Sequence, residues 1–176
     1  MKRDAALFLL GAWMLGILAM ALVAMENFYT IDRLLESASH ARFKAAVEAL
    51  DNTEGAPARD VLRYVSSELN RLFFMAWGVG EAAIGAVLVW LVWGLPDRRV
   101  RGALIGAWVL TLILTFAITP PIISVGRVLD FVPRDPPPPE LATFGMLYAA
   151  YSIADIVKLG LGLFAAWGIS RSGKQL

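Results

Sequence analysis

Four long apolar runs dominate the sequence, and each is close to the roughly 20 residues that a helix needs to cross a bilayer. Hydrophobic residues make up 58% of the chain and the mean hydropathy is +0.62, both high for a soluble domain. We therefore predict an all-α fold: a four-transmembrane-helix bundle forming a single integral membrane domain over residues 1–176. The predicted spans are residues 5–25, 72–94, 103–118 and 141–170. The basic start of the first run resembles a signal peptide, but the run is long for one, and we expect an uncleaved span.

A polar stripe interrupts the fourth apolar run at helical spacing. Tyr148, Tyr151, Ser152, Asp155 and Lys158 fall on one face of a helix. A charged side chain near the bilayer centre costs about 2.5 to 3.5 kcal/mol if it faces lipid. The stripe must therefore face protein or water, which predicts a bundle with a polar interior.

A third charged residue, Glu81, lies in the second run. Asp155 and Lys158 can pair within one helix at i, i+3, and Glu81 on a neighbouring span can also reach Lys158. Three interpretations are open: a buried ion pair or triad that fixes helix register, a water-filled pocket for an ion, proton or small ligand, or a contact with another subunit. The predicted lining of such a pocket is Trp77, Tyr148, Tyr151 and Ser152.

The segments between the runs are predicted to lie outside the membrane. Residues 26–71 carry many charges, and their apolar spacing predicts that the first helix continues to about Leu50, turns at 51–57 and returns as a helical hairpin. This hairpin is either a solvated surface or a binding surface. In the Pro-rich loop 119–140, Thr119-Pro120-Pro121 is expected to end or kink the third span and to cap a short interfacial helix, and residues 133–139 are expected to be extended.

The basic residues predict the orientation. Lys and Arg gather at the N-terminus, in the loop 96–101 and at the C-terminus, which lie on one side of a four-span protein. That side should be cytoplasmic, in a plasma membrane such as the bacterial inner membrane. The hairpin and the Pro-rich loop then face outside. Four tryptophans map close to the cytoplasmic side and are expected to form an aromatic belt: Trp90, Trp93, Trp108 and Trp167.

An internal repeat is also predicted. Residues 9–15 (LLGAWML) align with residues 104–110 (LIGAWVL), and Trp-Gly closes both the second and the fourth run. The second alignment places Glu81 opposite Asp155 and Trp77 opposite Tyr151. Two parallel helix-pair repeats, related by an axis along the membrane normal, would account for it.

Several features of this chain resemble a known family. They are a Gly-Ala-Trp first span with a long amphipathic continuation, a third span closing on Thr-Pro, and a fourth span with Phe144, Tyr148 and Ser152. The chain resembles the transmembrane-protein-two-hundred-and-five-like four-helix membrane family, whose bacterial members form a domain of unknown function. Where family members usually carry a histidine, this chain has Leu147-Tyr148. The resemblance implies the four-helix topology and assigns no functional residue.

The sequence narrows the function classes by what it lacks. It has no cysteine and one histidine, His40, so this chain alone supplies neither a thiolate nor a multi-histidine metal site. No catalytic motif is present, and we expect no catalytic residue, cofactor or metal. Our preferred interpretation is a non-enzymatic accessory or scaffold subunit of a larger membrane complex. The alternative is a small transporter or ion- or proton-conducting protein using Glu81, Asp155 and Lys158. Expected partners are the lipid bilayer and other membrane subunits or a second copy, with no nucleic acid.

Overall fold

The protein is all-helical in the computed structural model, which describes residues 2–37 and 40–172. Those residues contain helices and no strand. The elements are α1 (Lys2–Ser37), α2 (Ala41–Asp51), α3 (Ala58–Val92), α4 (Arg98–Ile113), a π-helical segment η1 (Leu114–Ile118), α5 (Thr119–Val128) and α6 (Glu140–Ser172). Four helices are long and apolar enough to cross a membrane: α1, α3, the continuous run α4–η1–α5, and α6. This confirms the prediction of an all-α chain with four candidate spans.

The helix that contains the third candidate span is longer than predicted. It does not end near Ile118 but runs through Pro120 and Pro121 to Val128. A proline inside a helix removes a donor and crowds the carbonyl one turn earlier. The wider π turn absorbs this change, since both the backbone N–H and the hydroxyl of Thr119 bond to the carbonyl of Leu114.

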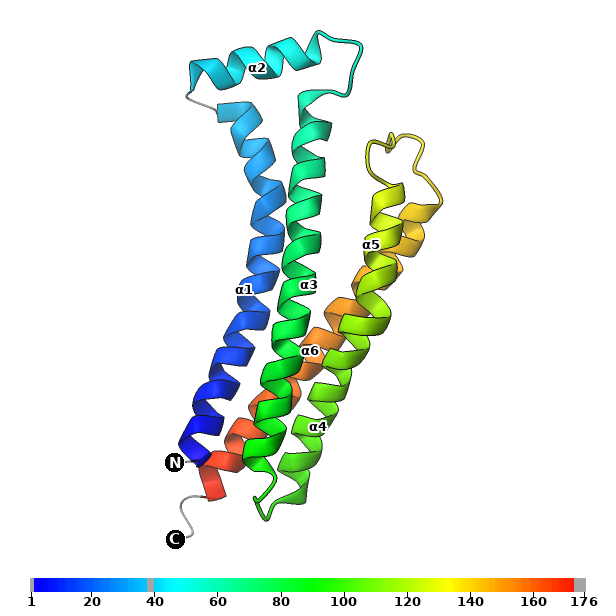
Figure 1. Cartoon of the computed structure of the whole chain (residues 1–176). Helices are drawn as coiled ribbons and strands as arrows, with labels where there is room; N and C mark the ends of the chain where they lie inside the picture. The colour runs from blue at the N-terminus through cyan, green and yellow to red at the C-terminus, as the bar shows by residue number, and fades with distance from the viewer. Residues whose placement is uncertain (1, 38–39, 173–176) are drawn as a thin grey trace.

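The hairpin also differs from the prediction. The first helix ends at Ser37 rather than continuing to about Leu50, and a separate helix, α2, lies across the ends of α1 and α3 (Figure 1). The Ser37 hydroxyl bonds back to the carbonyl of Arg33, and His40 caps α2 in an extended conformation. Serine and histidine are poor helix formers, and no residue of α2 is buried, so little packing opposes a break there.

The four long helices form two pairs that separate toward one end. Helix α1 packs along α3, and the run α4–η1–α5 packs along α6. The pairs meet where both termini lie, which we call the termini end, and diverge toward the opposite end, which we call the α2 end (Figure 1). The buried core lies in the termini half: Ala6, Leu10, Trp13, Ile17, Leu88, Val92, Val100, Leu104, Ala107, Ala165 and Ile169.

Glycines let the helices approach closely at the termini end. A side chain at Gly85 would collide with the Trp108 ring, and one at Gly168 would collide with Val100. Trp108, one of the four tryptophans of the predicted aromatic belt, is therefore half-buried against α3, where its indole N–H bonds to the carbonyl of Ala82. The other three tryptophans of that belt are more than half exposed: Trp90, Trp93 and Trp167.

Candidate functional site

A buried charged triad of Glu81, Asp155 and Lys158 joins the two helix pairs. The Lys158 ammonium on α6 lies 2.6 Å from Glu81 Oε1 on α3 and 2.8 Å from Asp155 Oδ1 on its own helix. Lys158 and Glu81 are almost fully buried. The predicted ion-pair contacts are therefore confirmed. Burying these charges costs hydration, and their mutual attraction must offset that cost.

The triad has a further partner that sequence reasoning missed. The indole N–H of Trp13, on α1, donates a 2.9 Å hydrogen bond to Glu81 Oε1. Trp13 is itself buried in the core. A buried indole N–H needs a hydrogen-bond acceptor, and the side chains of apolar spans offer few. Trp13 in the first apolar run was therefore the available signal for a contact with Glu81. The bond links α1 to the contact between α3 and α6.

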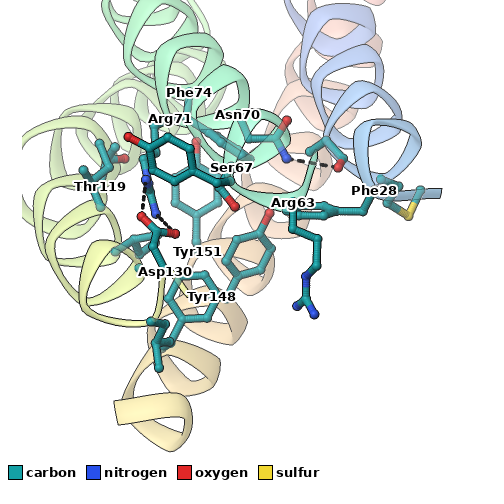
Figure 2. Close-up of a pocket in the computed structure, with 18 of the residues that line it drawn as sticks. Phe28, Arg63, Ser67, Asn70, Arg71, Phe74, Thr119, Asp130, Tyr148 and Tyr151 are labelled. Carbon is teal, nitrogen blue, oxygen red and sulfur yellow. Dashed lines mark hydrogen bonds and ion pairs between the residues drawn. The ribbon is translucent and has the colours of Figure 1, made fainter. Parts of the chain in front are cut away.

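A cleft of about 840 Å³ opens between the two helix pairs toward the α2 end. Most of the side chains that line it are apolar or aromatic, and Figure 2 shows several of them. The helix pairs close over the core at the termini end, so the cleft is blind there. Asp155 lies at its inner end with a side chain that is 24% exposed. One carboxylate of the triad is therefore accessible from the cleft.

The other predicted lining residues surround that inner end. Trp77, Tyr148, Tyr151 and Ser152 all line the cleft, whereas Glu81 and Lys158 lie behind it. Phe74 packs edge-on against both tyrosines, with ring centroids 5.5 Å from Tyr151 and 6.3 Å from Tyr148. The Ser152 hydroxyl is bonded to the carbonyl of Tyr148 on its own helix. Three aromatic rings, those of Phe74, Tyr148 and Tyr151, thus pack together in this part of the wall.

A second set of ion pairs stabilises the wall of the cleft. The guanidinium of Arg71 on α3 donates to Glu68 at 2.6 Å and contacts both carboxylate oxygens of Asp130 at 2.9 Å (Figure 2). This bidentate pair ties α3 to the segment after α5. Neither Arg71 nor Asp130 was predicted as a site residue. The available signal was Arg71 itself, a charged residue next to an apolar run. Its partner Asp130 lies 59 positions away, so helical spacing could not predict the pair.

Polar contacts also hold α1 against α3 beside the cleft. The Asn70 amide donates to the carbonyl of Ala24 at 3.1 Å and accepts a hydrogen bond from Asn27. The Ser66 hydroxyl donates to the carbonyl of Asn27 at 2.9 Å. These bonds hold α1 and α3 together as one wall of the cleft. The width of the cleft therefore depends on the position of the other helix pair, α4–η1–α5 with α6.

Two arginines lie at the mouth of the cleft. Arg63 belongs to α3, and Arg134 belongs to the loop between α5 and α6. Loss of hydration and repulsion from Arg63 lower the pKa of Arg134, while the charges of Asp130 and Asp60 oppose this. Among residues 2–37 and 40–172, neither arginine forms an ion pair with an acidic side chain within 4.0 Å. The mouth therefore offers two cationic groups close to each other.

The described part of the chain has no group of three His, Cys, Asp or Glu side chains placed to hold a metal ion. No family model, curated protein or solved structure matches this chain. The family resemblance noted from the sequence thus stays a prediction. What the chain does must be argued from the cleft and the triad.

Proposed function

We propose that this protein is a non-enzymatic membrane protein that holds an amphiphilic molecule of the bilayer in its cleft. One observation carries this proposal: a mostly apolar cleft, blind at the termini end and open at the α2 end, lies between helices that are apolar enough to span a membrane. An apolar cleft in a bilayer is in contact with lipid chains. Lipid chains can fill the cleft without exposing apolar surface to water.

The position of the cleft along α3 matches one leaflet. Trp93 is 63% exposed near the termini end, as expected for a tryptophan at the membrane surface. At about 1.5 Å per residue, Trp77 lies about 24 Å from Trp93 and Arg63 about 45 Å. A bilayer with its headgroups is about 40 to 45 Å thick. The cleft therefore extends from near the midplane to the far headgroup level.

The lipid-facing surface of α3 supports this placement. Val65 is 50% exposed and Leu69 is 41% exposed, although both belong to the α2 half of the helix. Apolar side chains at this level of α3 can remain exposed to lipid, because lipid chains are as apolar as they are. The apolar exposure on α3 thus reaches the level of the cleft mouth.

We propose that this binding serves a larger membrane complex, in which the chain is an accessory or scaffold subunit. Helix α2 has no buried residue and projects from the bundle, which leaves it free to contact another subunit. Under the predicted orientation, α2 and the mouth of the cleft both face outside. Isolation in mild detergent would test this role, since other membrane subunits should copurify at fixed stoichiometry. A chain that runs alone would contradict it.

A matched pair of substitutions tests ligand binding. Ala21 lines the cleft, whereas Ala19 is exposed on the same helix outside it. Ala21→Trp should fill the cleft and reduce the lipid retained by the purified protein, as measured by native mass spectrometry. Ala19→Trp adds the same side chain and should leave retention unchanged. Equal lipid retention in the two variants would contradict the proposal.

A second candidate function is conduction or transport of a proton or ion. Two observations favour it: the Asp155 side chain is 24% exposed and lines the cleft, and its buried Oδ1 accepts no well-directed hydrogen bond from the described residues, although Lys158 Nζ is 2.8 Å away. Flux into liposomes that disappears in Asp155→Asn would favour this candidate. Absence of flux in the unmodified protein would exclude it.

A further inference from the structure

Building on the proposed function, we propose that the ligand of the cleft is an anionic phospholipid whose headgroup binds between Arg63 and Arg134. The walls of the cleft would take the acyl chains, and the two arginines at its mouth would take the phosphate-bearing headgroup.

The charges lining the cleft favour a negative ligand at the mouth. The charges of Arg71 and Arg127 are matched by those of Glu68 and Asp130. Asp155 lies at the inner end, beside Lys158. Arg63, Arg134 and Asp60 are the remaining charged residues of the lining, and they carry one excess positive charge. An anionic headgroup would neutralise it.

The geometry of the two arginines suits a phosphate. They come from opposite walls, since Arg63 is on α3 and Arg134 is in the loop that joins α5 to α6. Figure 2 shows the Arg63 side chain with no dashed line to another residue. Guanidinium groups present several donors in a planar fork and bind phosphate oxygens in pairs. Two such groups can contact one phosphate from both sides.

The depth of the cleft suits the chains of a lipid from one leaflet. Arg63 and Trp77 are about 21 Å apart along α3, which is about half the thickness of a bilayer with its headgroups. Between them both helix pairs contribute apolar side chains to the walls, namely Ile17, Met20, Ala24, Phe74, Ile122 and Ile123, and the polar groups of Asn70, Arg71 and Asp130 beside them are bonded to one another or to the backbone.

A spanning helix of another protein fits this space less well. The core closes the termini half of the bundle, so such a helix would have to leave the cleft halfway through the membrane. It would also leave the excess positive charge at the mouth without a partner unless it carried an acid at that level. An anionic phospholipid ends within one leaflet, as the closed core requires, and its headgroup supplies the negative charge that the mouth lacks.

The test compares headgroup selectivity. The protein is reconstituted in nanodiscs of phosphatidylcholine and phosphatidylglycerol in equal amounts, released gently, and analysed by native mass spectrometry for bound lipid. We expect phosphatidylglycerol to be enriched over phosphatidylcholine. The double variant Arg63→Gln/Arg134→Gln should lower this enrichment by roughly tenfold, which corresponds to about 1.4 kcal/mol.

A double variant with the same change in charge is the control. Arg42 lies on α2 and Arg59 pairs with Asp32, so both are at the α2 end but outside the cleft. Arg42→Gln/Arg59→Gln should keep the enrichment. Equal losses in the two double variants would show a non-specific surface effect and overturn the proposal.

The outcomes separate this inference from the proposed function. If lipid is bound and is displaced by Ala21→Trp, but the Arg63 and Arg134 substitutions leave selectivity unchanged, the cleft binds lipid and the headgroup inference is wrong. If the unmodified protein retains no lipid, or retains a polypeptide in its place, both proposals fail.

Discussion

At the residue scale, the charged triad of Glu81, Asp155 and Lys158 links side chains of α3 and α6. Lys158 is in contact with two carboxylates, and Trp13 donates to one of them. The net stability of such a cluster is modest, because desolvation offsets attraction, but removing one partner leaves the others without compensation. The triad is therefore expected to behave as a unit, because Lys158 contacts a carboxylate on each of α3 and α6.

Lys158→Met should lower stability strongly, by about 3 to 5 kcal/mol, because it leaves the buried Glu81 without its cation. Adding Glu81→Gln to this variant should recover part of the loss. Thermal unfolding of the single and double variants in the same detergent, monitored by circular dichroism, would compare their stabilities. If the losses in the two single variants simply add in the double variant, the side chains are not coupled.

At the element scale, helix contacts at the termini end depend on small residues at particular positions. Gly85 faces the ring of Trp108, whereas a side chain at Gly80 would meet nothing within 4 Å. The two glycines lie on the same helix and are five residues apart. They therefore form a matched pair for testing the contact between α3 and α4.

Gly85→Ala should destabilise the bundle by about 1 to 3 kcal/mol, because the new methyl group displaces the Trp108 ring and strains its hydrogen bond to Ala82. Gly80→Ala should be neutral or should stabilise α3 by up to about 1 kcal/mol, since alanine is the better helix former. Unfolding temperatures measured side by side would check this. Equal effects would contradict the packing described.

Element boundaries show where sequence reasoning succeeds and where it stops. Apolar runs of spanning length predicted the four long helices, and i, i+3 spacing predicted the contact of Asp155 with Lys158. The helix that contains the third predicted span continues past Ile118, because a π turn before Pro120, which composition does not signal, accommodates the prolines. The shape of the cleft was not predicted, because hydrophobic periodicity indicates which face of a helix is buried but not the angle between helix pairs.

At the scale of the whole molecule, the predicted repeat and the predicted orientation both stay predictions. The two helix pairs correspond to the proposed halves, but their tryptophans are bonded differently. Trp13 donates to Glu81, whereas its counterpart Trp108 donates to the backbone of Ala82 and not to Asp155. Glu81 and Asp155, which align in the repeat, instead share Lys158. Any duplicated pattern has therefore diverged at the triad.

Cysteine labelling should decide the orientation, because the chain contains no cysteine of its own. Glu54→Cys places a thiol in the turn between α2 and α3, and Gly94→Cys places one at the termini end. In intact cells, a membrane-impermeant maleimide should label position 54 and should label position 94 only after permeabilisation. The reverse pattern would invert the predicted topology and place the cleft mouth in the cytoplasm.

The central claim is that the cleft holds a lipid, and photocrosslinking in a bilayer tests it most directly. The protein would be reconstituted with phosphatidylglycerol carrying a diazirine near the middle of one chain, irradiated, digested and analysed by mass spectrometry. Adducts should concentrate on cleft residues such as Met20, Phe74 and Ile122, above those on Leu15 and Leu18, which are exposed on α1 outside the cleft. Labelling of Leu15 and Leu18 equal to or above that of the cleft residues would contradict the account.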